Sequence, residues 1–105
     1  MWNRCYDIIM QTSIGVRYGT MSVTVDNSKI EGMMNILKKE NPFSGTIDEK
    51  GDCQIHGEIT TLTRTIPYEA VGQINKDRLQ LKVEGGQECF DISGTVLTEE
   101  KEPGV

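Results

Sequence analysis

Apolar and polar residues alternate along most of this chain, and turn-forming residues interrupt the alternation at short intervals. In "FSGTIDEKGDCQIHGEI", Phe43 and Ile47 share one phase, and Ile55 and Ile59 continue the same alternation beyond a charged turn. Successive side chains of a β-strand point to opposite faces, so period-two patterning between turns is typical of antiparallel strands. The chain is therefore predicted to be all-β.

The buried phase can be followed from one predicted strand to the next. Turns are predicted between the apolar groups, including one at 40–42 ("ENP") and one near 61–63. A helix over 28–40 is the competing assignment, but the interior Gly32 and the alternation of its neighbours favour a strand. The residues of the buried phase are Tyr6, Ile8, Met10, Ile30, Met34, Ile36, Phe43, Ile47, Cys53, Ile55, Ile59, Ile66, Tyr68, Ala70, Ile74, Leu79, Leu81, Val83, Phe90, Ile92 and Val96.

About eight short strands joined by short links predict a single up-and-down antiparallel meander barrel. Closure of the meander removes the exposed strand edges that would otherwise promote aggregation. The barrel is expected to span residues 1–98, and the acidic end of the chain, 99–105, is expected to be a flexible tail.

Most of the predicted strands carry one glycine in the buried phase. These glycines are Gly32, Gly45, Gly57, Gly72 and Gly94. Glycine inside a strand marks a bulge, a barrel corner or a close approach of another group. The interior of so small a barrel has little spare room, so we favour a role in curvature over a role in ligand approach.

The segment from Tyr6 to Gly32, "YDIIMQTSIGVRYGTMSVTVDNSKIEG", resembles small uncharacterised bacterial β-barrel domains. The shared features are an opening aromatic residue, a Thr-x-x-Gly turn (Thr12, Gly15), a Gly-Thr-Met run and an Asp-x-x-apolar-x-Gly hairpin. The opening residue is Tyr6, whereas those domains usually have tryptophan there. The wider resemblance is to calycin-type (lipocalin-like) and streptavidin-like meander barrels. Many of those hold a small molecule in the barrel mouth, and the resemblance transfers no binding residue.

Composition and charge narrow the class of protein. The chain has 105 residues, 36% of them hydrophobic, which suits one domain with one core. The net charge of −5, without a basic stripe, argues against nucleic acid and anionic membranes as partners. No apolar run is long enough to cross a bilayer, and no signal peptide is predicted.

The three cysteines, Cys5, Cys53 and Cys89, are odd in number and widely spaced, which is unlike a disulfide framework. The simplest interpretation is a cytoplasmic protein with reduced thiols. One disulfide with a spare thiol remains the alternative.

Catalytic chemistry has the weakest support. The single histidine, His56, lies three residues from Cys53, and this offset on a strand places the two side chains on opposite faces. We found no nucleophile, phosphate-binding or metal-ligand motif. No catalytic residue, metal site or cofactor is therefore predicted, and an enzyme is the least supported of three hypotheses.

The favoured hypothesis is a module that binds a small, largely apolar molecule in the barrel mouth. The mouth is expected at the end formed by 12–14, 39–42, 61–63 and 85–87. Arg64 shares the phase of Ile66 and Tyr68 and would be the polar anchor, unless a bulge at Pro67 turns it outward. The predicted ligand-binding residues are Met10, Met34, Phe43, Arg64 and Tyr68.

The alternative is a fully packed barrel that acts as a homo-oligomeric structural or protein-interaction module. Several apolar residues fall in the outward phase, and together they could form a homodimer face. These residues are Ile9, Met33, Leu37, Val71 and Leu97.

Overall fold

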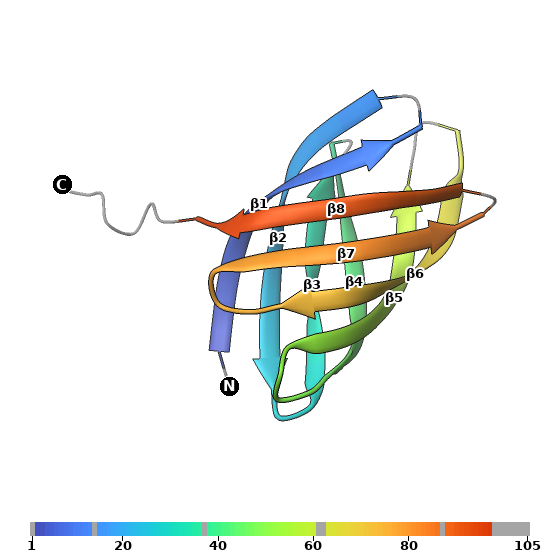
Figure 1. Cartoon of the computed structure of the whole chain (residues 1–105). Helices are drawn as coiled ribbons and strands as arrows, with labels where there is room; N and C mark the ends of the chain where they lie inside the picture. Colours follow the sequence, from blue (N-terminus) through green and yellow to red (C-terminus); the bar gives the residue numbers. More distant parts are fainter. Residues whose placement is uncertain (1, 14, 37, 61–62, 87, 98–105) are drawn as a thin grey trace, which may run out of the picture.

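The computed structural model describes residues 2–13, 15–36, 38–60, 63–86 and 88–97, and it confirms the closed barrel. Each strand pairs antiparallel with the next, and β1 also pairs with β8, which closes the up-and-down meander (Figure 1). The predicted tail, 99–105, lies outside the described residues. The strands are β1 (Trp2–Thr12), β2 (Gly15–Asp26), β3 (Lys29–Ile36), β4 (Lys39–Ile47), β5 (Asp52–Thr60), β6 (Thr65–Ile74), β7 (Arg78–Gly85) and β8 (Glu88–Val96).

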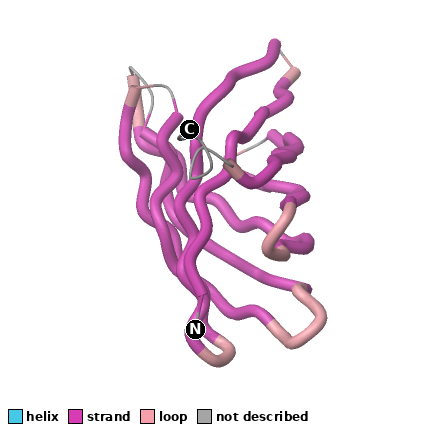
Figure 2. Tube along the Cα trace, turned by 90° about the vertical axis from the view of Figure 1, so that its left-hand side faces the viewer, coloured by secondary structure: helices cyan, strands magenta, loops and turns pink. Residues whose placement is uncertain are grey.

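Strands make up nearly all of the described trace, and short loops join their ends (Figure 2). We call the end where β1 meets β2, β3 meets β4, β5 meets β6 and β7 meets β8 the mouth end. Within the described ranges, no helix is long and apolar enough to cross a membrane.

β3 confirms the preference for a strand over a helix, but the turn that follows it was predicted in the wrong place. Lys38, with a φ of 65°, makes the turn, and Lys39 already pairs with Ile36. Asn41 and Pro42 therefore belong to β4. Pro42 lies one residue beyond the end of the β4–β5 ladder, where a missing N–H disturbs the sheet least.

Most side chains of the predicted buried phase form one core inside the barrel, whereas Ile66 is only half-buried and lies outside this cluster. The strands alternate buried and exposed residues, as the sequence pattern requires. Cys53 is buried in this core and His56 is exposed, so the prediction that they lie on opposite faces is confirmed. At the edges of the core, Trp2, Phe90 and Val96 are partly buried against it.

The strand glycines are sites of close backbone approach. A Cβ added to Gly32 would lie 1.9 Å from the carbonyl oxygen of Ser22 on β2 and 2.8 Å from Cζ of Phe43. At Gly45 the added atom would lie 2.0 Å from the carbonyl oxygen of Gln54 on β5. No side chain fits at either position, which supports the role in curvature over a role in ligand approach.

The end opposite the mouth is held by hydrogen bonds that side chains make to the turns. The hydroxyl of Tyr6 donates to the carbonyl oxygen of Asn75, and Asn75 Oδ1 accepts from the backbone N–H of Asp77 (2.9 Å) and Arg78 (3.0 Å). Asp48 Oδ1 accepts from two N–H groups of its own turn in the same way. Asn and Asp side chains stabilise turns by this mechanism, and the charged turn that contains Asp48 was predicted from the sequence.

Candidate functional site

The predicted ligand-binding residues other than Arg64 all point into the barrel. Met10, Met34, Phe43 and Tyr68 come from β1, β3, β4 and β6, and each is at most 4% exposed. They belong to the same core cluster. The structure thus confirms that these side chains face inward and buries them in the core. Any binding site among them therefore lies in the core rather than in an open mouth.

Arg64 does not point inward. The β5–β6 ladder ends at Thr60 and Thr65, and Arg64 precedes β6 with its side chain exposed. The prediction that Arg64 faces inward is therefore wrong, and a bulge at Pro67 is not the reason, because β6 pairs regularly with β5 through Pro67. Arg64 lies outside because no ladder holds it in the phase of the strand, and a guanidinium is better solvated in water than beside an apolar core.

Arg17 is the basic residue that the alternation places toward the mouth. It pairs directly with Met10 across β1 and β2, so both belong to the inward phase. Its side chain is exposed, and Nη1 donates to the carbonyl oxygen of Val16 at 3.2 Å. The sequence could have predicted the inward phase of Arg17, because this residue alternates with the inward-facing Gly19 and Met21.

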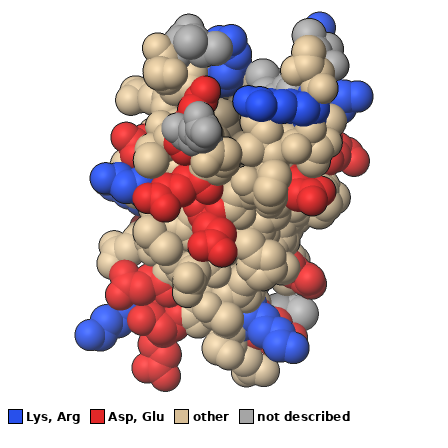
Figure 3. Space-filling model, turned by 90° about the vertical axis from the view of Figure 1, so that its right-hand side faces the viewer, with Lys and Arg blue, Asp and Glu red and all other residues tan. Residues whose placement is uncertain are grey.

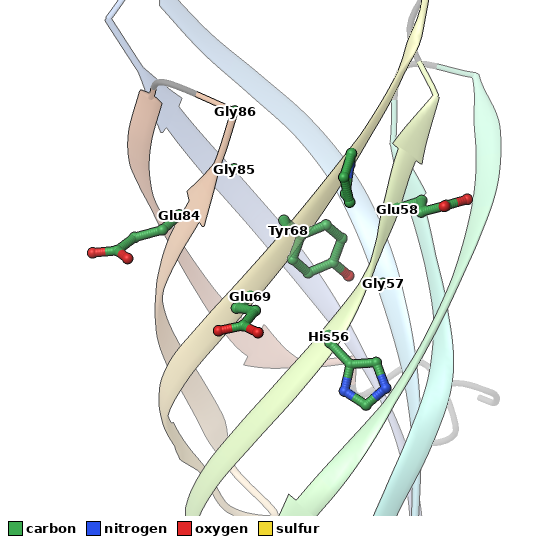
Figure 4. A pocket seen from close by; sticks show the side chains of 9 residues that line it. His56, Gly57, Glu58, Tyr68, Glu69, Glu84, Gly85 and Gly86 are labelled. Carbon is green, nitrogen blue, oxygen red and sulfur yellow. The ribbon is translucent and has the colours of Figure 1, made fainter.

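The hydroxyl of Tyr68 is buried without a hydrogen-bond partner among the residues that the structure describes. Burial raises the pKa of Tyr68 to about 12, so the group is a neutral phenol at physiological pH. Figure 4 shows the ring with its hydroxyl on the side of Gly57. A Cβ added to Gly57 would lie 3.0 Å from that oxygen. Among the described residues, none therefore uses the hydrogen-bonding capacity of this buried hydroxyl.

Asn41 is a buried polar residue that the sequence analysis missed, because it was assigned to a turn. Its Nδ2 donates to the carbonyl oxygens of Met34 (3.1 Å) and Lys39 (3.2 Å), and its Oδ1 accepts from the backbone N–H of Thr60 (3.0 Å). Continuing the alternation from Phe43 back through residue 41 would have placed it inward.

Two neighbouring grooves lie on the outside of the wall on either side of Gly57. One crosses β5, β6 and β7, and its edge carries His56, Glu58, Glu69 and Glu84 (Figure 4). Glu69 and Glu84 are direct cross-strand partners, an arrangement in which like charges repel. The other groove covers the mouth-end half of β4 and β5.

Acidic and basic side chains both lie on this side of the barrel. Several Asp and Glu side chains lie near the middle of the face in Figure 3, and others lie beside Lys and Arg at its edges. His56 is exposed, and its Nε2 lies 3.4 Å from Oγ of Ser44. Within the described part of the chain, no three His, Cys, Asp or Glu side chains are placed to hold a metal ion.

A third groove crosses the opposite side of the wall, over β2, β1, β8 and β7. Tyr18, which is 73% exposed, and its cross-strand partner Ile9 lie at one edge. The small side chains of Ser93 and Thr95 and the bare backbone of Gly94 form part of its lining.

Comparison with known proteins supports the fold alone. No family model matches the chain, and no curated protein matches it either. Among solved structures, a de novo designed fluorescence-activating β-barrel is similar, with a TM-score of 0.63 and 10% sequence identity. The match covers 91% of this chain and 94% of the designed one. This chain is thus a small eight-stranded antiparallel barrel like the designed protein.

Proposed function

We propose that this protein is a non-enzymatic module that binds a small, largely apolar molecule inside the mouth-end half of the barrel. The observation that carries the proposal is the buried hydroxyl of Tyr68, which has no hydrogen-bond partner among the described residues. Leaving a buried hydroxyl without a partner costs about 1–3 kcal/mol, and a bound molecule with a suitable polar atom would remove that cost. The ligand would therefore combine an apolar body with one hydrogen-bonding group.

Met10 and Met34 support binding within a packed core. Both are buried in the cluster that includes Phe43 and Tyr68. Methionine is unbranched and flexible, so it can rearrange around a guest at lower cost than a branched residue. The apolar body would take the volume that the two methionine side chains occupy in this structure.

The proposal groups the chain with calycin-type (lipocalin-like) and streptavidin-like barrels, and with the bacterial domains that its sequence resembles. The support is the meander topology and the motifs between Tyr6 and Gly32. We further propose a cytoplasmic location, because all three cysteines are unpaired thiols.

Native mass spectrometry of protein purified from cells without denaturation tests the proposal. We expect the protein to carry an extra mass that is released on collisional activation. We also expect it to bind Nile red, a neutral apolar dye with a carbonyl acceptor, with an increase in dye fluorescence. Tyr68→Phe keeps the ring and removes the hydroxyl, so it should weaken dye binding by about tenfold. Tyr18→Phe on the outer surface is the matched control and should bind as the wild type does. A clean ligand-free mass together with no dye binding would contradict the proposal.

A homo-oligomeric interaction module is the second candidate, and the exposed pair of Tyr18 and Ile9 beside the third groove favours it. An aromatic side chain next to a groove lined by small residues is a common feature of interfaces.

The predicted interface residues do not form one patch. Met33 pairs with Ser22, which pairs with Cys5, and the N–H of Leu97 donates to the carbonyl oxygen of Cys5 at 2.8 Å. Met33 and Leu97 therefore lie along one row around Cys5. Val71 lies on β6, across the barrel from β2, and Leu37 lies outside the described residues.

Light scattering at several concentrations tests the second candidate. If Tyr18 is at a dimer interface, Tyr18→Ser should give a monomer, whereas Val71→Ser on the far side should leave the dimer intact. A wild-type protein that is monomeric at all concentrations would remove this candidate.

A further inference from the structure

The ladder between β4 and β5 stops short of the mouth end. β3 and β4 remain paired as far as Ile36 and Lys39, and β5 and β6 remain paired as far as Thr60 and Thr65. Pairing between β4 and β5, in contrast, ends at Phe43 and Gly57. Beyond this point, two neighbouring segments of the wall are not joined by ladder pairing. These segments are 39–42 on β4 and 58–60 on β5. We call these two segments the β4–β5 seam.

The side chain of Asn41 bridges the seam. Its Oδ1 accepts from the N–H of Thr60 on β5, while its Nδ2 holds the carbonyl oxygen of Met34 on β3. Pro42, the next residue of β4, has no N–H to offer. A side-chain hydrogen bond thus joins strands that backbone bonds join elsewhere in the ladder, and such a bond can break and reform by rotation of one side chain.

An outer groove lies directly over the seam, and the hydroxyl of Tyr68 lies beneath it. The groove is lined by residues of both strands, among them Pro42, Gly57 and Glu58. A Cβ added to Gly57 would lie 2.7 Å from the carbonyl oxygen of Pro42 and 3.0 Å from the hydroxyl oxygen of Tyr68. Gly57 thus lines the groove and lies close to the buried hydroxyl, with no side chain of its own between them.

We propose that the β4–β5 seam is a lateral opening of the ligand site, and that the hydrogen bond from Thr60 N–H to Asn41 Oδ1 holds it closed. The ligand passes between β4 and β5, and its polar atom then meets the hydroxyl of Tyr68. This inference rests on the function proposed above. Glu40 and Glu58 border the groove, so the seam disfavours a carboxylate and favours a neutral molecule with a hydroxyl or carbonyl group.

Hydrogen exchange followed by NMR tests the seam without any ligand. The amide of Thr60 should exchange at least tenfold faster than that of Leu81, which lies in a strand paired on both sides. Asn41→Ala should accelerate exchange at Thr60 about tenfold more, in line with the loss of one hydrogen bond, and leave Leu81 unchanged. If the amide of Thr60 is as protected as that of Leu81 in the wild-type protein, the seam does not open and the inference is wrong.

Stopped-flow binding of Nile red tests the route. The Pro42→Cys/Glu58→Cys disulfide should slow dye association at least tenfold, in a Cys5→Ser/Cys89→Ser background. The Gln73→Cys/Gln80→Cys disulfide joins directly paired positions of β6 and β7, and as the matched control it should leave the rate unchanged. Equal rates for both cross-linked proteins would overturn the lateral route and indicate access from the open end. If the dye fails to bind even to the wild-type protein, the proposed function fails, whereas the exchange of Thr60 still decides whether the seam opens.

Discussion

Replacing Gly32 by alanine is expected to destabilise the barrel severely. The added Cβ would lie 1.9 Å from the carbonyl oxygen of Ser22, whereas real Cβ atoms essentially never come closer than 3.0 Å. The paired strands β2 and β3 must therefore separate locally by about 1.1 Å, the difference between those two distances. Backbone hydrogen bonds of about 2.9 Å do not survive such a displacement.

The magnitude follows from the bonds and contacts that this displacement removes. Losing about two ladder bonds and leaving their groups buried costs about 3–5 kcal/mol, and the clash with Phe43 adds to this. Small domains are stable by only about 5–15 kcal/mol, so the variant should lose at least about 12 °C in melting temperature or fail to fold.

Urea unfolding followed by far-UV circular dichroism measures the effect. Gly85→Ala is the matched control, because its added Cβ would lie 3.0 Å from Cβ of Tyr68 and 3.1 Å from the carbonyl oxygen of Pro67. That variant should stay within about 1.5 kcal/mol of the wild type. If Gly32→Ala proves as stable as Gly85→Ala, the wall does not need a side-chain-free position at 32, and the curvature argument is wrong.

Three further predictions concern buried titratable groups. Tyr6→Phe removes the hydrogen bond to the Asn75 turn and should destabilise the protein by about 1 kcal/mol in urea unfolding. Tyr68→Phe removes a hydroxyl that has no partner among the described residues, so the same measurement should show a neutral or stabilising effect. Burial raises the pKa of Tyr6 and of Tyr68 to about 12, from 10 in the unfolded chain. The folded state therefore keeps these protons when the unfolded state has lost them, so stability should be fully present below pH 10 and fall between pH 10 and 12, and a flat profile there would contradict the burial argument. Burial, with smaller contributions from the neighbouring Asp52 and Asp48, raises the pKa of Cys53 to about 11, so two thiols should react quickly with Ellman's reagent at pH 8 and Cys53 only on unfolding.

The fold could be predicted from the sequence because the alternation of apolar and polar residues is a property of each strand by itself. Alternation at Tyr6, Ile8 and Met10 sets the inward face of β1, and the structure keeps that face. The glycine of β3 in the buried phase indicated curvature before any contact was known, since an interior glycine is unfavourable in a flat strand. The segment 28–40 shows the limit of such patterns, because its strand was predicted but the turn after it was placed too late.

The positions of several candidate site residues, in contrast, could not be predicted, because they depend on where the pairing between neighbouring strands ends. The phase of Arg64 says nothing about whether a strand extends that far, and the structure ends the β5–β6 ladder before it. The role of Asn41 requires three groups from β3, β4 and β5, which only the closed barrel brings together.

The sequence by itself determined which residues face inward, because each strand must bury its apolar face whatever its neighbours are. Only the tertiary structure decided which inward polar groups are satisfied. A partner for Tyr6 comes from a turn far along the chain, whereas Tyr68, equally inward by pattern, meets none among the described residues. Hydrogen bonding depends on distances of a few tenths of an ångström between strands, and alternation along one strand does not set those distances.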